Sequence, residues 1–318
     1  MLDSGAEART FLLRDLPLVQ RLKSQGISLD SESYLVRGLH TIEDAALSRL
    51  PLVDLGAPTL VVRYNGTPII GQMRHSAGDT HAHIVFVSPT LTNGYDDTLE
   101  AAWFHLLDAL AAVAGQRGAH TIHAEVNENS IVFETLCQAG YASYAQQDIW
   151  RRDPAPPPDT SQIVVPRQAT ADDLPAIRRL HDRLVPALAQ QADPLPAPDG
   201  LIQMQDGRAA GYLAVRTGSR GIFLRPYLPP DDPALARGMV IAALAMLPGA
   251  AKTPVYCCVR GYQRWLGGLL EALGFKPWAR QTVMVRHTVA RIERPAFAPL
   301  PAAVQGGISV SGGHGGRH

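Results

Sequence analysis

The chain has 318 residues, of which 46% are hydrophobic and 18% are charged, and its 29 basic residues balance its 29 acidic residues. This length suits two domains better than one, and the composition is that of an ordinary soluble globular protein. A net charge of zero excludes a general nucleic-acid binder, because such a protein needs a basic surface to neutralise phosphates.

The three cysteines, Cys137, Cys257 and Cys258, form no CxxC motif and allow no disulfide framework, which favours a reducing, cytoplasmic location. The N-terminal residues lack the basic-then-apolar pattern of a secretion signal. The longest apolar helix that we expect, over residues 99–114, is interrupted by His105 and Asp108. We therefore expect no membrane span.

The first half of the chain predicts strands and helices in a definite order. It should contain a strand and helix over 11–22, further helix within 31–50, a hairpin over 59–75, a strand over 81–89, a helix over 99–114, a strand over 121–126, a short helix, and a last strand ending at 151. Asn65-Gly66 is a strong signal for a tight hairpin turn. Thr41 and Asp44 form a capping box within the additional helical sequence.

The second half repeats this order, and the repetition is the main organising feature of the sequence. It should contain a strand and helix over 164–180, a hairpin over 201–216, a strand over 221–226, a helix over 233–247, a strand over 254–259, a short helix, and a last strand ending at 287. Asp206-Gly207 predicts the second hairpin turn. In both halves the short helix ends in glycine and an aromatic residue, Gly140-Tyr141 and Gly274-Phe275.

A proline-rich stretch, DPAPPPDTS, separates the halves near the middle of the chain. The sequence after residue 294 turns to proline, alanine and glycine, which is typical of a disordered tail. We therefore predict four parts: a first domain, a linker, a second domain and a tail, over residues 1–152, 153–162, 163–294 and 295–318.

The predicted order in each half is β-α-β-β-β-α-β-α-β. It indicates an α/β fold with a mixed, mostly antiparallel sheet, one parallel β-α-β junction, and flanking helices. We expect the last strand to close its own half. Ligands in such sheets tend to bind where the strands diverge beside the crossover helix, which points to residues 85–98 and 125–130.

Both halves resemble the GNAT superfamily of N-acetyltransferases. In the first half, Asn129 precedes Gly140-Tyr141 by eleven positions, and in the second half the run LLEALGF ends at Phe275. The hairpin turns, each followed by a glycine at 71 or 211, also fit. The resemblance implies two tandem GNAT-like domains, acetyl-CoA as cofactor, no metal, and acyl transfer to an amine.

The resemblance also implies which residues would hold the cofactor in the first half. The pantetheine arm would lie along the two diverging strands and the pyrophosphate at the start of the crossover helix. The residues at these places are Val85, Val87, Val126 and Asn129 for the arm, and Asn93 and Gly94 for the phosphates. An asparagine before a helix is also an ordinary N-cap, so Asn129 has two interpretations.

The phosphate loops depart from the family spacing R/Q-x-x-G-x-G/A. In the first half the key places fall on Thr92, Tyr95 and Asp97, and Gly94 is out of register. Paired acids, Asp96-Asp97 and Asp231-Asp232, stand where phosphate would lie. We interpret these acids as helix caps, which satisfy the N–H groups that would otherwise hold a phosphate.

The proton donor of the family is also missing, because the position that often carries tyrosine is Leu136 in the first half and Leu270 in the second. Glu125, His83 and Tyr144 are the remaining acid–base candidates. An alternative use of His83, with His81 and His123, would be a metal site if their rings converged.

Two functions therefore stay open after sequence analysis. The first is an acyl-CoA-dependent N-acyltransferase that modifies a small-molecule or peptide amine, with its active site expected in the first half. The second is a catalytically inactive tandem pair that serves as a binding or interaction module. The sequence points to neither a nucleic-acid partner nor a membrane partner.

Overall fold

The computed structural model describes residues 6–38, 57–92, 94, 96–158, 165–191 and 193–288. The Thr41–Asp44 capping box and the tail at 295–318 lie outside these residues, as does the end of the linker. Within the described residues, none of the helices combines the length and apolarity that a membrane span requires.

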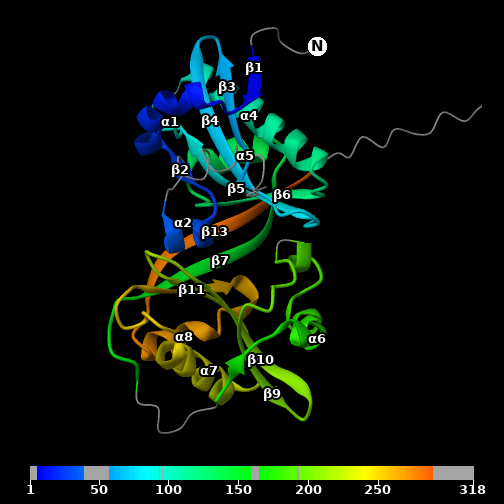
Figure 1. The fold of residues 1–318 in the computed structure, drawn as a ribbon, viewed down its shortest axis with the longest axis vertical. Coiled ribbons are helices and arrows are strands. Elements are labelled where there is room, and N and C mark those ends of the chain that lie inside the picture. Colours follow the sequence, from blue (N-terminus) through cyan, green and yellow to red (C-terminus); the bar gives the residue numbers. More distant parts are fainter. Residues whose placement is uncertain are drawn as a thin grey trace, which may run out of the picture.

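The first half contains the predicted elements in the predicted order, with one additional strand, β2, near its start (Figure 1). The helix α2 lies within the predicted range 31–50, whereas the first strand, β1, lies ahead of the predicted range 11–22. Its elements are β1 (Ala6–Thr10), α1 (Leu16–Leu22), β2 (Ile27–Ser28), α2 (Ser31–Arg37), β3 (Thr59–Tyr64), β4 (Thr67–Arg74), β5 (His81–Ser88), α4 (Asp97–Gln116), β6 (Thr121–Val126), α5 (Ile131–Gln138) and β7 (Ala142–Arg152).

The second half follows the same order without an insertion, so the sequence repeat is a structural repeat. Its elements are β8 (Arg167–Gln168), α6 (Leu174–Leu184), β9 (Gly200–Gln205), β10 (Arg208–Thr217), β11 (Ile222–Tyr227), α7 (Pro233–Met246), β12 (Val255–Arg260), α8 (Leu266–Ala272) and β13 (Lys276–His287).

The two predicted hairpin turns form where the sequence placed them. Asn65 and Gly66 have φ values of 47° and 83°, and Asp206 and Gly207 have φ values of 50° and 71°. Positive φ at both central residues is the geometry of a type I′ turn, which matches the twist of the strands on either side. These turns fix the register of β3 with β4 and of β9 with β10.

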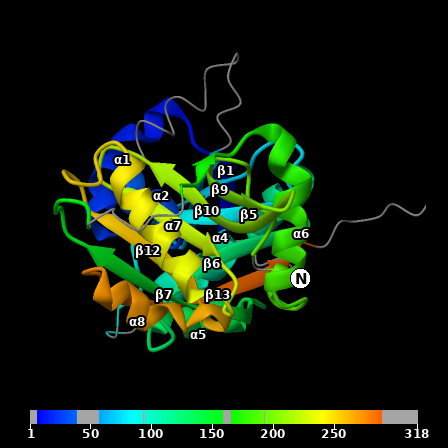
Figure 2. The same cartoon turned by 90° about the horizontal axis from the view of Figure 1, so that it is seen from below.

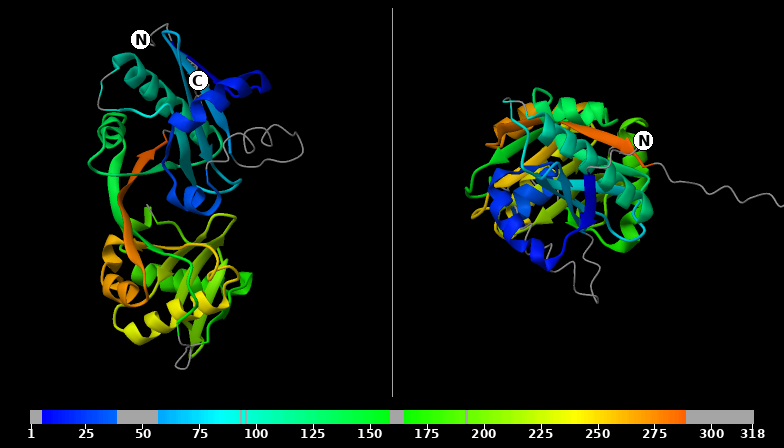
Figure 3. Two further views of the ribbon diagram at one scale, coloured as in Figure 1. Left: turned by 90° about the vertical axis from the view of Figure 1, so that its left-hand side faces the viewer. Right: turned by 90° about the horizontal axis from the view of Figure 1, so that it is seen from above.

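The last strand of each half closes the sheet of the other half. β13 lies between β6 and β7, and β7 lies between β13 and β12, all of them antiparallel pairs. Figures 1 and 3 show these two long strands running between the lobes. The expectation that each last strand closes its own half was therefore wrong, and one continuous sheet joins the halves.

Each half keeps the single parallel junction that was predicted, β5 with β6 and β11 with β12. In the first half, α4 and α5 pack on one face of the sheet around Trp103, Leu107 and Leu136. In the second half, α7 and α8 pack on one face and α6 on the other (Figure 2). The parallel strands separate after His83↔His123 in the first half and after Leu224↔Cys257 in the second.

Candidate functional site

The gap between β5 and β6 is closed by the chain itself. Residues 25–31, which we name the bridging segment, run between the two strands, and Ile27 pairs with Val87. The Leu29 N–H donates to the Val85 carbonyl at 3.1 Å, while the Leu29 carbonyl accepts from the Glu125 N–H at 2.8 Å. One residue therefore hydrogen-bonds to both strands at the point where they diverge.

The bridging segment lies so close to β5 that it requires a glycine. A Cβ atom at Gly26 would lie 2.1 Å from the Cζ atom of Phe86 and 2.8 Å from the Val87 carbonyl oxygen. Phe86 is buried, so its ring has little room to move away. At the start of the segment, the Gln25 carbonyl accepts from the Thr90 N–H at 2.8 Å. Glycine at position 26 thus allows the segment to pair with the strand.

The predicted pantetheine residues lie in these surroundings. The backbone edge of Val85 and Val87 is hydrogen-bonded or paired by the bridging segment, so it is not free for another chain or ligand. Val126 is buried in the core beneath α4 and α5. Asn129 is exposed in a turn, where its N–H donates to the side chain of Asn127 at 3.0 Å.

Asn129 does not cap α5, so the capping interpretation of this residue was wrong. The cap is Ser130, whose hydroxyl oxygen accepts from the Phe133 N–H at 3.2 Å.

The predicted phosphate loop carries an acidic helix cap. Asp96 accepts from the N–H groups of Thr98 and Leu99 at 3.0 and 3.2 Å, which satisfies the first turn of α4. Gly94 lines a cavity of about 250 Å³ beside Asp96, and Asn93 lies outside the described residues. In the second half, Asp232 accepts from the Leu235 N–H at 2.8 Å. A carboxylate occupies the donors at both helix starts and would repel a phosphate.

Of the three acid–base candidates, the structure places two on the same face near the gap. Glu125 is buried, and its carboxylate accepts from the Ser31 N–H at 2.9 Å. His83 lies on the neighbouring strand at the last parallel pair. Tyr144 lies on β7, separated from β6 by β13, and its hydroxyl is hydrogen-bonded to His287 Nε2 at 2.9 Å. Tyr144 is therefore not brought together with Glu125 and His83.

Three histidines form a row at the base of the gap. The ring centroid of His123 lies 5.3 Å from that of His81 and 5.0 Å from that of His83. Burial and the neighbouring His81 lower the pKa of His123 to about 3. Burial, followed by the charge of Arg74, holds the pKa of His83 well below its usual value. No group of three potential metal ligands was found among the residues that the structure describes.

The corresponding gap in the second half is filled by side chains. The Asp193 carboxylate accepts from the hydroxyls of Tyr227 and Tyr262 at 3.1 and 2.7 Å. It also lies 3.6 Å from a guanidinium nitrogen of Arg225 and of Arg260. Burial raises the pKa of Asp193, but the two arginine charges outweigh it and the pKa is lowered. Sequence reasoning missed Asp193, because it stands alone in a loop without a motif.

A polar chain continues from this cluster into the first half through the exchanged strands. Arg260 donates to the side-chain oxygen of Gln147 on β7. Gln147 Nε2 donates to Gln281 Oε1 on β13 at 2.9 Å, and this oxygen also accepts from the Ser31 hydroxyl at 2.8 Å. The charged gap of the second half is thus connected to the start of α2.

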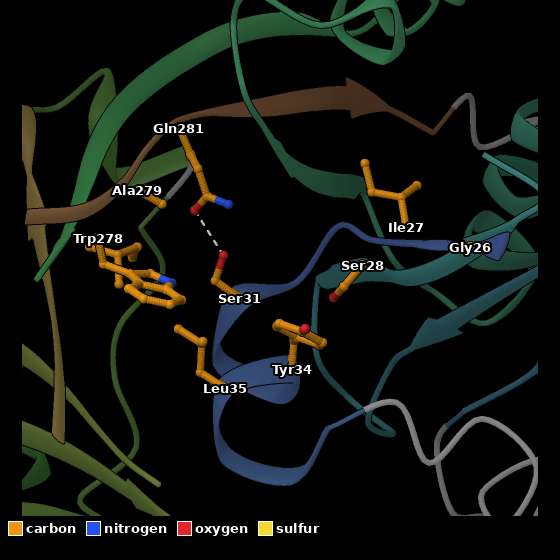
Figure 4. A pocket seen from close by; sticks show the side chains of 10 residues that line it. Gly26, Ile27, Ser28, Ser31, Tyr34, Leu35, Trp278, Ala279 and Gln281 are labelled. Carbon is orange, nitrogen blue, oxygen red and sulfur yellow. Dashed lines mark hydrogen bonds between the residues drawn. The ribbon is translucent and has the colours of Figure 1, made fainter. Parts of the chain in front are cut away.

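A second cavity, of about 330 Å³, opens where α2 faces the exchanged strands (Figure 4). Ser31 points toward Gln281 in this view, and Trp278 lies near Leu35. The bridging segment forms the opposite wall through Ile27 and Ser28. The cavity therefore combines a few hydroxyl and amide groups with an aromatic wall.

No family model and no curated protein sequence matches this chain. Solved structures do match: a GCN5-related N-acetyltransferase from Sphaerobacter thermophilus has a TM-score of 0.54 and 12% identity, over 91% of this chain and 97% of its own. This coverage spans both halves. The chain has the GNAT acetyltransferase fold.

Two other solved structures cover similar shares at lower TM-scores. A putative acetyltransferase from Pyrococcus horikoshii has a TM-score of 0.48 and 10% identity, over 90% of this chain and 91% of its own. A tandem GNAT protein from the clavulanic acid biosynthesis pathway has a TM-score of 0.48 and 13% identity, over 89% of this chain and 98% of its own.

The position of the GNAT proton donor lies in apolar core in both halves. Leu136 and Leu270 are both fully buried, so neither position can be reached by a departing thiolate. Tyr141, which follows α5, is buried too, and burial raises its pKa above the usual value. A hydroxyl in such a setting is a poor proton donor.

Proposed function

We propose that this chain is a tandem GNAT-fold binding module that does not transfer acyl groups. One observation carries the proposal: Leu29 hydrogen-bonds to both Val85 and Glu125, at the place where the resemblance would put the pantetheine arm and thioester. Backbone N–H and C=O groups that are already paired gain no additional hydrogen bond by binding a ligand instead.

The acidic helix starts support the same proposal independently. Phosphate binding at a helix start needs free N–H donors and a positive local potential. Asp96 and Asp232 occupy donors at both starts and add negative charge there. The cofactor would have to displace the bridging segment and also overcome this repulsion.

Calorimetric titration of acetyl-CoA into the full chain tests the proposal. We expect no saturable heat up to millimolar acetyl-CoA. The Asp96→Ala variant is the matched control, because it removes the acid but leaves the bridging segment in place, and it should bind no better. Micromolar binding to the unmodified chain would overturn the proposal.

A second candidate is N-acyl transfer by the first half, after the bridging segment moves away. It is favoured by the buried carboxylate of Glu125 at the gap, since a carboxylate could accept a proton from an amine directly or through water. The cavity beside Ser31 and Trp278 would then receive the amine. Release of free CoA thiol with a panel of amines, abolished by Glu125→Gln, would establish this activity.

A further inference from the structure

A separate cavity of about 200 Å³ lies between the two halves, on the face of β5 that carries His83. Basic, acidic and apolar side chains share its wall, the acidic ones being Glu32, Asp79 and Asp199. The basic and apolar ones that matter here are Arg74, His83, Leu195, Arg216, Phe223 and Arg225. The cavity adjoins the cofactor gap at His83 but lies outside it, because none of its lining residues belongs to the segment 25–31 or to the loop before α4.

Two of the arginines are neutralised by close carboxylates. Arg74 Nε lies 2.5 Å from Asp30 Oδ2, a buried acid. Arg216 lies 2.5 Å from Asp199 and 3.3 Å from Glu32. Their charges and donors are used within the protein, so they contribute little to binding a ligand.

Arg225 differs from these two, because its guanidinium makes no hydrogen bond within the described residues. Its nearest carboxylate oxygens belong to Asp193 and Glu32, at 3.6 and 3.7 Å. Its Nε atom is buried and has no hydrogen-bond partner, and 17% of the side chain is exposed. Buried donors of this kind are costly unless something accepts from them.

The acids near Arg225 are already shared. Asp193 also accepts from Tyr227 and Tyr262 and lies equally close to Arg260, while Glu32 also pairs with Arg216. Neither of these carboxylates lies within hydrogen-bond distance of the Arg225 guanidinium, so its donors remain unpaired among the residues that the structure describes. A ligand with two acceptor oxygens would supply the hydrogen-bond partners that the Arg225 guanidinium lacks.

We propose that this cavity binds a small organic carboxylate, with Arg225 as its anchor. The planar guanidinium matches the two oxygens of a carboxylate, and the imidazole of His83 adds a hydrogen bond without adding charge. Phe223 and Leu195 contact the carbon skeleton. The acids Glu32, Asp79 and Asp199 on the same wall disfavour polyanions such as nucleotide phosphates.

This inference names a ligand class for the binding function but does not depend on the exclusion of acetyl-CoA. If acetyl-CoA binds and carboxylates still bind through Arg225, the proposed function fails and this inference stands. If neither binds, the inference fails and the exclusion of acetyl-CoA stands.

The test is calorimetric titration of the full chain with butyrate, benzoate and succinate, with benzamide as the uncharged analogue of benzoate and inorganic phosphate as a second anion. We expect saturable binding of at least one carboxylate and none of benzamide. Arg225→Gln should weaken carboxylate binding at least tenfold, and Arg225→Lys, which keeps the charge but not the planar fork, should also weaken it. Arg280→Gln is the matched control, since Arg280 is an exposed arginine paired with Asp148 on β7, away from the cavity.

Arg225→Gln should still fold, because Asp193 keeps Arg260 and both tyrosine hydroxyls as partners. Three outcomes overturn the inference: no carboxylate binds, phosphate binds as tightly as the best carboxylate, or folded Arg225→Gln and Arg225→Lys both bind like the unmodified chain.

Discussion

The two gaps between parallel strands have the same origin but opposite contents. In the first half, backbone fills the gap, with Leu29 hydrogen-bonded to both strands and neutral histidines at the base. In the second half, charged and phenolic side chains fill it, centred on Asp193. The space between two diverging strands can thus be filled either by backbone amides or by buried charged side chains. We expect different substitutions and pH changes to destabilise the two arrangements.

Removing the buried charge of the second gap should have the largest effect. Asp193→Ala leaves Arg225 and Arg260 without their common carboxylate and leaves two tyrosine hydroxyls unpaired. Breaking a buried ion pair from one side costs about 3–5 kcal/mol. We expect the free energy of unfolding, measured by urea denaturation, to fall by that amount. Asp199→Ala, at an exposed carboxylate, is the control and should cost less than about 1 kcal/mol; equal losses would contradict the assigned role of Asp193.

Acid should weaken the first gap through its histidines. Because the folded-state pKa of His123 is about 3, the unfolded chain binds a proton below pH 6.5 that the folded chain does not bind. Stability should therefore fall as the pH decreases, with a contribution from His123 of about 2 kcal/mol between pH 6.5 and 5. Denaturation midpoints across this range should show a shallower fall in His123→Asn, and an unchanged slope would argue against a buried neutral ring.

A single methyl group should disturb the bridging segment. Gly26→Ala places a Cβ atom against Phe86 and the Val87 carbonyl, and overpacking of this kind costs roughly 1–2 kcal/mol. Gly268→Ala is the matched control, because its Cβ meets no atom within 4 Å and alanine favours the helix α8. Thermal unfolding should show destabilisation in the first variant only. A gain of acetyl-CoA affinity in Gly26→Ala would identify the segment as the barrier to the cofactor.

Removing the acid at the start of a helix should have the smallest effect on stability. Asp96→Ala removes acceptors for two N–H groups of α4 and should cost about 1 kcal/mol. Asp97→Ala removes only a first-turn charge and should cost about 0.3 kcal/mol. The difference between the stability losses of the two variants, measured from urea denaturation midpoints, distinguishes the hydrogen bonds of the cap from the electrostatic effect of a nearby charge. Similar losses in both variants would contradict capping by Asp96.

Local signals in the sequence predicted the elements well, because each depends on residues close together in the chain. Asn65-Gly66 and Asp206-Gly207 require positive φ, and the helix-ending Gly140 and Gly274 require it too, both at 83°. The acidic caps follow from the same local chemistry. These features need no knowledge of which strand lies beside which.

Features that depend on distant pairing were not predictable in the same way. Alternation of apolar residues marks β7 and β13 as strands but does not say whose sheet they complete. The polar sequence ISLDS around Leu29 gave no sign that it would lie between β5 and β6. Asp193 acquires its partners from residues 34 and 69 positions away. His83 was named from the sequence as an acid–base candidate, but Arg216 and Arg225, which line the same cavity, come from the other half.

The exchange of β7 and β13 also affects how the chain can mature during synthesis. The open edge of β6 is covered by β13, which leaves the ribosome roughly 150 residues later, or on the order of ten to thirty seconds. Until then, β6 presents unpaired N–H and C=O groups, the kind of edge that recruits strands from other chains. The first half is therefore synthesised first, but its sheet is complete only after the last strand of the second half has been made.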